Sequence, residues 1–241
     1  IVMNNPKSIS LIFPLYRDKY TVKKVIDKSL KILKKLKIKY EIIIIDDYCP
    51  EKSGLVALKY SKNNKRIKVI FHKKNYGYGA AIRTGFKNSK YECVYAVDGD
   101  GEFGIALNDL PRILNKYKFN DLVITYRYKK RYKTIRIIIS WVYNSMLRVL
   151  FNINFKDISS GSRLVNKKIL NKIKLTTNSP FIGAELAIKA KYLGYKIDEV
   201  GIHSFPSNFR AGSSIVLKNI LITIRDIFKL YYNINIKKKI N

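Results

Sequence analysis

The chain has 241 residues, of which 47% are apolar and 27% charged, and this balance excludes an intrinsically disordered protein. The 12 glycines and 6 prolines are too few for a collagen-like or low-complexity chain, so a globular protein is expected. Lysine and arginine together number 48 against 17 aspartates and glutamates, and the resulting net charge of +31 favours nucleic acids, nucleotides or an anionic membrane surface as partners.

Apolar runs and helix-period segments alternate through the first half of the chain. β-Branched runs at 8–13 and 40–45 predict strands, the second buried on both faces of a parallel sheet. Between them, apolar residues from Val22 to Leu36 recur at helical spacing with lysines opposite, which predicts an amphipathic helix. Further strands are expected at 67–71, 93–97 and 122–126, and further helices from about Ala80 and around 107–116. This order predicts an α/β fold with a mostly parallel sheet flanked by helices.

The pattern changes from about residue 128 to two basic amphipathic segments. A basic stretch at 129–136 precedes an apolar one at 137–155, and no carboxylate lies between Asp121 and Asp157. In the tail, 215–232, one expected helix face is apolar and the other basic. The apolar face comprises Leu217, Ile220, Leu221, Ile224, Ile227, Phe228 and Tyr231, and the basic face comprises Lys218, Arg225 and Lys229. Helices of this kind lie in a membrane interface. We expect the α/β domain to cover 1–214, and an amphipathic helix with a basic tail to cover 215–241.

Polar side chains gather directly after the expected strands. After the first strand, Pro14 is followed by Tyr16, Arg17 and Asp18. Asp46 and Asp47 follow the second strand, the segment from Asp98 to Glu102 follows the fourth, and Arg127 follows the next. In parallel α/β sheets, ligands bind beyond the carboxyl ends of the strands. We therefore expect these side chains to converge on one rim.

Three carboxylates, Asp98, Asp100 and Glu102, stand on alternate residues at one strand end. Carboxylate oxygens are ligands of hard divalent cations, so this spacing predicts a Mg²⁺ or Mn²⁺ site completed by water or phosphate. A solvated acidic turn is the alternative interpretation.

Two further segments near this rim have more than one interpretation. Asp46 and Asp47 can accept hydrogen bonds from a base or ribose, or they can form a turn. The run from Asn75 to Ala81 opens a helix, and its glycines let the backbone approach a ligand closely. Neither GxGxxG nor GK[ST] is present, so no dinucleotide site and no P-loop is predicted.

The cysteines, the histidines and the apolar runs carry weaker signals. Only Cys49 and Cys93 are present, which excludes a disulfide framework and favours a reducing compartment. His72 and His203 stand alone and are interpreted as structural or surface residues. The longest uncharged apolar run, 137–147, is shorter than the roughly 18 residues of a spanning helix. The first residues lack the order of a signal peptide. We expect no membrane span.

Together these motifs resemble the family 2 glycosyltransferases, in the dolichol-phosphate mannosyltransferase or polyprenyl-phosphate glycosyltransferase branch. The resemblance spans 8–214. Residues 14–18 are similar to P-x-Y-N-E, with Arg17 in place of asparagine and Asp18 in place of glutamate. Residues 46–53 are similar to D-D-G-S-x-D-x-T, with Tyr48 and Cys49 in place of glycine and serine. Cys49 is therefore interpreted as a substitute for serine.

The later motifs follow the same family in the same order. Residues 75–81 with Arg83 resemble N-x-G-x-G-x-A, and Asp98-Gly99-Asp100 resembles its DxD. Arg127 matches G-S-R, and 157–164 resembles D-x-x-S-G-F-R-L. Residues 181–186 resemble its acidic helix, and 210–214 its R-x-G-x-S-K loop, with Ser214 in place of lysine.

The resemblance implies a GT-A-type fold and an inverting, metal-dependent transfer. The donor is a nucleotide sugar, GDP-mannose or a UDP-sugar, and the acceptor is a polyprenyl phosphate at the cytoplasmic membrane face. The implied donor-binding residues are Pro14, Tyr16, Asp18, Asp46, Asp47, Asn75, Gly79, Arg83, Asp98 and Gly99. The implied metal ligands are Asp98, Asp100 and Glu102, for Mg²⁺ or Mn²⁺. The implied catalytic residues are Asp100, Glu185, Arg127 and Arg210, and those for the acceptor phosphate are Arg127, Arg131, Arg163 and Ser213.

Two alternatives stay open at this point. A phosphate acceptor is already anionic and needs no general base, whereas a glycan hydroxyl acceptor needs one, for which Glu185 is the candidate by motif. The alternative outside enzymes is a basic nucleic-acid-binding protein. It is less favoured because the sequence lacks a zinc finger or RNP-like motif and its carboxylates gather at the expected rim, so no nucleic acid is expected as a partner.

Overall fold

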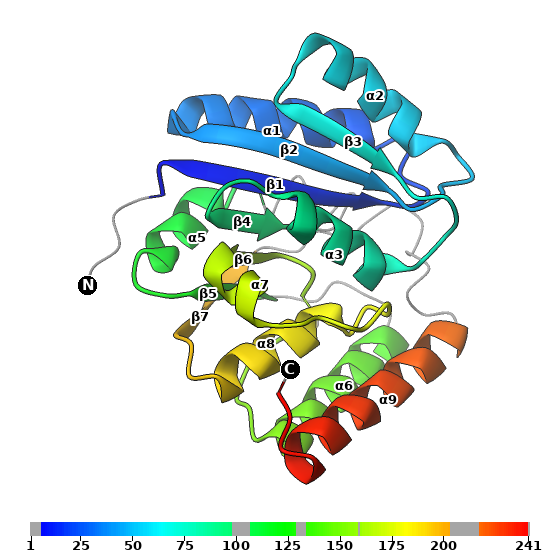
Figure 1. The fold of residues 1–241 in the computed structure, drawn as a ribbon, viewed down its shortest axis with the longest axis vertical. Coiled ribbons are helices and arrows are strands. Elements are labelled where there is room, and N and C mark those ends of the chain that lie inside the picture. The colour runs from blue at the N-terminus through cyan, green and yellow to red at the C-terminus, as the bar shows by residue number, and fades with distance from the viewer. Residues whose placement is uncertain (1–5, 98–106, 129–133, 159, 203–216, 241) are drawn as a thin grey trace.

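The computed structural model describes residues 6–97, 107–128, 134–158, 160–202 and 217–240. A seven-stranded sheet lies at the centre, and helices cover both of its faces (Figure 1). The strands are β1 (Ser8–Leu15), β2 (Lys39–Asp46), β3 (Ile67–Phe71), β4 (Cys93–Ala96), β5 (Leu122–Arg127), β6 (Arg163–Asn166) and β7 (Ile197–Ile202). The helices are α1 (Val22–Leu36), α2 (Ser53–Asn63), α3 (Tyr78–Asn88), α5 (Leu110–Tyr117), α6 (Thr134–Phe151), α7 (Lys167–Lys172), α8 (Ile182–Tyr192), α9 (Leu217–Tyr231) and the π-helix η2 (Tyr232–Ile236).

The sheet has the strand order β3-β2-β1-β4-β6-β5-β7. Neighbours from β3 to β4 are parallel, and so are β5 and β7, whereas β6 runs antiparallel to β4 and β5. Because β6 reverses direction on both sides, every strand except β6 ends at the same edge of the sheet. The expectation of a mostly parallel sheet is confirmed, and β1, β2, β4 and β5 end at one edge of the sheet.

Alternate residues of the central strands face two separate hydrophobic clusters. Ile42 and Ile44 pack with residues of α1, α2 and α5, and Ile43 and Ile45 pack with residues of α3, α6, α8 and α9. All four isoleucines are fully buried. A strand covered on both faces favours a continuous β-branched run, which is why this strand was predictable from the sequence.

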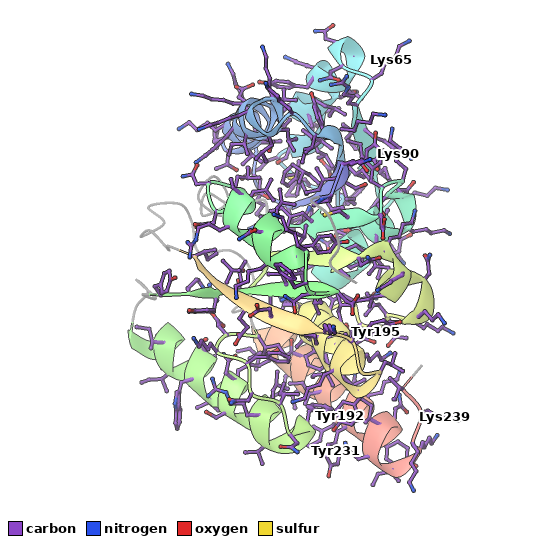
Figure 2. All side chains as sticks on the ribbon, turned by 90° about the vertical axis from the view of Figure 1, so that its left-hand side faces the viewer. Lys65, Lys90, Tyr192, Tyr195, Tyr231 and Lys239 are labelled. Atoms are coloured by element: carbon purple, nitrogen blue, oxygen red, sulfur yellow. The ribbon has the colours of Figure 1, made fainter. Side chains whose placement is uncertain are left out.

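Helices α6 and α9 lie side by side on the sheet face that α8 also covers (Figure 1). At their ends, the Phe151 ring packs edge-on against Tyr231 with centroids 6.1 Å apart, and the Tyr192 hydroxyl donates to the Phe151 carbonyl (Figure 2). Both helices are partly exposed. No helix within the described ranges is long and apolar enough to span a bilayer.

The helix expected in the tail is present as α9, and its apolar face is only partly buried. Ile227 is buried in the core, whereas Leu221, Ile224 and Phe228 of the same expected face are 68%, 39% and 55% exposed. Apolar residues occupy more than one side of α9, and the sheet covers only one of these sides. The helix therefore has a core-facing apolar side and a separate exposed one.

Candidate functional site

Asp46 shapes the turn that follows β2. Its carboxylate accepts hydrogen bonds from the amides of Cys49 at 2.7 Å and Gly54 at 2.6 Å, and its side chain is buried. Two main-chain donors on a buried carboxylate fix the chain between β2 and the first turn of α2. Of the two interpretations of Asp46, the structure shows the turn.

Asp47 shapes the loop that precedes α3, again through main-chain amides bound to its carboxylate. Its Oδ1 accepts the Tyr76 amide at 2.9 Å and its Oδ2 accepts the Gly77 amide at 2.8 Å. Oδ1 also lies 2.6 Å from Nδ1 of His72. Asp47 thus joins the end of β2 to the glycine loop, where the chain has a positive φ of 95° at Gly77.

The loop after β1 is tied to the turn after β2. The Arg17 amide donates to Cys49 Sγ at 3.0 Å, and the Asp18 amide donates to Ser53 Oγ at 3.1 Å. Asp18 in turn accepts the Tyr16 amide at 2.9 Å. Cys49 Sγ lies 3.0 Å from Ser53 Oγ, so Cys49 takes part in the hydrogen bonding expected of the serine it replaces. Pro14 is buried inside β1, next to Ile45.

Arg17 and Tyr48 have left-handed backbone conformations, with φ of 65° and 57°. These are the positions at which the family motifs carry asparagine and glycine, the residue types that tolerate a positive φ best. The two departures from the motif therefore keep its backbone shape, although a non-glycine residue in this conformation costs about 1–2 kcal/mol. The Tyr48 side chain is 62% exposed at the rim.

The first turn of α3 packs against the segment 177–179, a contact that no sequence pattern indicated. The Gly79 amide donates to the Asn178 carbonyl at 2.8 Å, and the Arg83 guanidinium donates to the Thr177 carbonyl. Partial burial lowers the pKa of Arg83, while the charge of Glu185 opposes that shift. Arginine titrates so far above neutrality that Arg83 stays charged. Asn75, just upstream, is exposed.

Two of the three arginines expected at the acceptor phosphate lie within the described residues, and their surroundings differ. Arg127, at the end of β5, donates through Nε to Asp157 Oδ2 at 3.0 Å, and its side chain is 13% exposed. Arg163 is buried, and its guanidinium donates to the carbonyls of Ile158 and Ser160. It lies directly against Gly183, where any Cβ would overlap it. Arg163 thus braces the turn before β6 from within the core.

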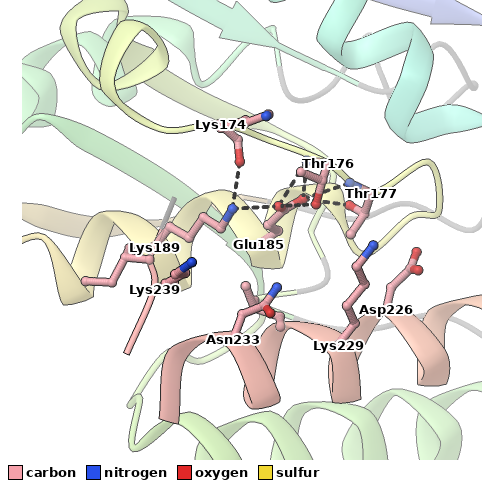
Figure 3. Close-up of a pocket in the computed structure, with 11 residues that line it drawn as sticks. Lys174, Thr176, Thr177, Glu185, Lys189, Asp226, Lys229, Asn233 and Lys239 are labelled. Atoms are coloured by element: carbon pink, nitrogen blue, oxygen red, sulfur yellow. Dashed lines mark hydrogen bonds and ion pairs between the residues drawn. The ribbon is translucent and has the colours of Figure 1, made fainter. Parts of the chain in front are cut away.

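Glu185, the expected general base, lies fully buried in the first turn of α8 (Figure 3). Its carboxylate accepts hydrogen bonds from the amides and hydroxyls of Thr176 and Thr177 at 2.8–3.2 Å. Lys189 lies 3.0 Å from Oε1 and also donates to the Lys174 carbonyl at 2.6 Å. A general base needs a lone pair within reach of the acceptor. Here the carboxylate instead holds the 174–177 segment onto α8.

A cavity of about 210 Å³ separates this cluster from α9. Lys229 and Asn233 line it from the α9 side, opposite Glu185 and Thr177 (Figure 3). None of the residues that line it belongs to α3 or to the loops after β1 and β2. The cavity therefore does not belong to the rim formed by β1, β2 and α3.

Several expected site residues lie outside the described residues. They are Asp98, Gly99, Asp100, Glu102, Arg131, Arg210 and Ser213. The described part does fix where the acidic segment begins, because β4 lies between β1 and β6 and the Val97 amide donates to the Ile12 carbonyl at 3.1 Å. Elsewhere in the described ranges, no three His, Cys, Asp or Glu side chains are arranged to hold a metal ion.

Residues 10–174 match the family model for glycosyl transferase family 2. The chain belongs to this family. Among curated relatives, a dolichyl-phosphate beta-glucosyltransferase of Dictyostelium discoideum is 25% identical over 81% of this chain and 65% of its own length. Another, from Trichomonas vaginalis, is 21% identical over 95% of this chain and 75% of its own length. The Bacillus subtilis glycosyltransferase CsbB is 27% identical over 72% of this chain, which spans about half (53%) of it.

Solved structures confirm the fold class of this family 2 member. Glucosyl-3-phosphoglycerate synthase from Mycobacterium tuberculosis, in complex with Mn²⁺, UDP and phosphoglyceric acid, superimposes with a TM-score of 0.72 at 16% identity. The superposition covers 94% of this chain and 78% of the synthase. The expected GT-A-type architecture and the expected family are both confirmed.

Proposed function

We propose that this family 2 protein transfers a sugar, with inversion and with the help of a divalent metal, from a nucleotide sugar to a polyprenyl phosphate at a membrane surface. The observation that carries the proposal is the rim at the carboxyl edge of β1 and β2. There, Asp46 and Asp47 bind amides of the turn after β2 and of the glycine loop before α3. Cys49 and Ser53 tie the loop after β1 to the same turn. The dolichyl-phosphate glucosyltransferases among the relatives support the choice of acceptor.

We infer a UDP-sugar, and specifically UDP-glucose, as the donor. Two of the three relatives named above are dolichyl-phosphate beta-glucosyltransferases, and the synthase has been crystallised with Mn²⁺ and UDP-glucose. The alternative donor, GDP-mannose, has no counterpart among these relatives. Proposed donor contacts are the rim residues Tyr16, Asp18 and Asn75. The loops around them are shaped by Asp46, Asp47, Gly79 and Arg83.

The proposed metal ligands are Asp98, Asp100 and Glu102, at the end of the central strand β4. A bound Mg²⁺ or Mn²⁺ would balance the negative charge that develops on the departing nucleoside diphosphate. Arg210 is proposed to stabilise the same charge from the protein side. With the leaving group stabilised in this way, no protonated acid is required.

A phosphate acceptor fits the described geometry better than a sugar hydroxyl. A phosphate monoester is anionic at neutral pH, so its oxygen attacks without a general base and needs only to be oriented. Glu185 is enclosed and fully hydrogen-bonded, so the one base that the sequence suggested for a hydroxyl acceptor is occupied. We propose Arg127, Arg131 and Ser213 as ligands of the acceptor phosphate, and a structural role for Arg163.

The membrane contact is proposed to be the exposed side of α6 and α9. Large apolar side chains are exposed on both helices: Ile138, Trp141, Val142 and Val149 on α6, and Leu221 and Phe228 on α9. Arg225 and Lys229 are exposed next to them on α9. Clusters of exposed large apolar side chains mark sites of protein or membrane contact, and the adjacent cations suit anionic lipid.

Replacing Trp141 and Phe228 together by serine is expected to weaken binding to anionic vesicles by at least about tenfold, because each large side chain contributes roughly 1.5–3 kcal/mol when buried. Vesicle sedimentation at low and high salt measures this. Phe119→Ser, at a residue that is 57% exposed after α5, is the matched control and should bind like the wild type. Binding of the wild type that ignores both anionic lipid and salt would contradict the proposal.

The proposed reaction is tested by incubating the protein with UDP-glucose, Mn²⁺ and a short-chain polyprenyl phosphate in mixed micelles. Mass spectrometry of the organic extract should detect the glucosylated lipid phosphate, and EDTA should abolish it. Transfer to an oligosaccharide but not to the lipid would support the glycan-elongating alternative instead.

A further inference from the structure

His72 connects three elements next to the rim. It follows β3, and its amide donates to the Asp46 carbonyl at 2.9 Å. Its ring nitrogens lie 2.6 Å from Oδ1 of Asp47, the residue after β2, and 2.9 Å from Oγ1 of Thr84 on α3. The ring also packs edge-on against Tyr76, with centroids 5.2 Å apart. The sequence showed only a lone histidine, but the fold gives it a partner on every side.

The direction of these hydrogen bonds follows from the partners. The Asp47 carboxylate only accepts, so the nitrogen facing it, Nδ1, carries the hydrogen. The Thr84 hydroxyl can donate to a neutral ring or accept from a protonated one. The bond from Nδ1–H to Asp47 is therefore present in either state of the ring.

Asp47 then accepts three hydrogen bonds, from His72, Tyr76 and Gly77. The imidazole is held from behind by Thr84, and the side chains of His72 and Asp47 are only 10% and 5% exposed. His72 therefore fixes the rotation of the carboxylate. That rotation decides whether both loop amides are reached at once.

We propose that His72 is a positioning residue for the nucleotide-sugar site: it orients Asp47 so that the glycine loop 75–79 keeps the shape in which its backbone meets the donor. The inference rests on the proposed function for the identity of the ligand. The hydrogen-bond chain from Thr84 through His72 and Asp47 to the loop belongs to the fold itself.

Two substitutions at His72 distinguish the contribution of the Nδ1 hydrogen bond from that of the Nε2 hydrogen bond. The amide nitrogen of asparagine can occupy the place of Nδ1, and that of glutamine the place of Nε2. His72→Asn should keep the bond to Asp47 and behave like the wild type within about threefold. His72→Gln and His72→Ala should lose that bond, while Thr84→Val should remove only the outer contact and have a smaller effect.

The first readout is amide hydrogen exchange at Tyr76 and Gly77, without any ligand. Protection should fall by about tenfold or more in His72→Gln and His72→Ala and persist in His72→Asn. The second readout is steady-state kinetics. The KM for UDP-glucose should rise about tenfold or more in the first two variants, with kcat and the acceptor KM changed less than about twofold.

Equal exchange and equal donor KM in His72→Gln and His72→Asn would overturn the inference, because only the asparagine amide takes the place of Nδ1 facing Asp47. If His72→Ala does not fold, the comparison of His72→Gln with His72→Asn still tests the inference, because both replacements are polar and can hydrogen-bond at this position. A wild-type protein without affinity for any nucleotide sugar would contradict the proposed function alone, and the exchange data would still decide whether His72 positions the loop.

Discussion

Replacing Glu185 by alanine is expected to lower the free energy of unfolding by about 3–5 kcal/mol, because it leaves a buried ammonium group without its counter-charge. Lys189 is only 4% exposed and pairs with Glu185 at 3.0 Å. The amides and hydroxyls of Thr176 and Thr177 lose their acceptor in the same step. Urea unfolding followed by circular dichroism measures the loss.

Two control variants distinguish the loss of the Glu185 charge from the loss of its side-chain volume. Glu185→Gln keeps the volume but points an amide donor toward other donors, so a smaller loss of about 1–3 kcal/mol is expected. Adding Lys189→Met to Glu185→Ala should cost less than the sum of the single changes, because it removes the unpaired charge. A Glu185→Ala protein as stable as the wild type would refute the structural role. A fully folded Glu185→Gln protein that no longer transfers sugar to a hydroxyl acceptor would instead support Glu185 as the general base.

Replacing Gly79 by alanine is expected to destabilise the protein by about 1–3 kcal/mol and to weaken donor binding by about tenfold. A Cβ at this position would lie 2.5 Å from the Thr177 carbonyl oxygen and 2.9 Å from that of Ser179. Both are main-chain atoms, so α3 or the 177–179 segment must move, and the contact with Arg83 moves with it.

The sign of the Gly79 effect is informative. Alanine is usually more stable than glycine inside a helix by up to about 1 kcal/mol, so propensity alone predicts the opposite result. Thermal unfolding and titration with UDP-glucose and Mn²⁺ check both parts. Lys87→Ala, at an exposed position in the last turn of the same helix, should leave both unchanged. Unchanged stability and affinity in Gly79→Ala would show that α3 does not depend on this contact.

Strands β1, β2, β4 and β5 were predictable because burial on both faces selects continuous apolar, β-branched runs such as Ile42–Ile45. The edge strand β3 is only partly buried and was predictable from its short apolar run. Strand β6 was not predicted, since its four residues include Arg163 and Asn166 and carry no period of their own. It exists because β4 and β5 both offer it hydrogen-bond partners. Such pairing depends on strands that are distant in the sequence, so a local sequence pattern does not predict it.

The rim was predictable for a topological reason, since parallel strands bring their carboxyl ends together. The partners of its side chains were not. Asp47 bonds amides about thirty residues further along the chain, and Arg83 bonds a carbonyl 94 residues away. Such contacts depend on where α3 and the 177–179 segment meet. Likewise, the substitutions at Arg17 and Tyr48 looked like losses in the sequence, yet both residues keep the left-handed backbone that the motifs favour.

The most direct measurement is a thermal-shift titration of the wild type and of Asp100→Asn with UDP-glucose and GDP-mannose, each with Mn²⁺ or with EDTA. A ligand at 100 times its Kd stabilises the native state by about 2.7 kcal/mol, which raises Tm by several degrees. We expect this rise with UDP-glucose and Mn²⁺, and its loss with EDTA and in Asp100→Asn. A folded wild type with no shift for either nucleotide sugar, or an equal shift in Asp100→Asn, would contradict a metal-dependent donor site on this rim.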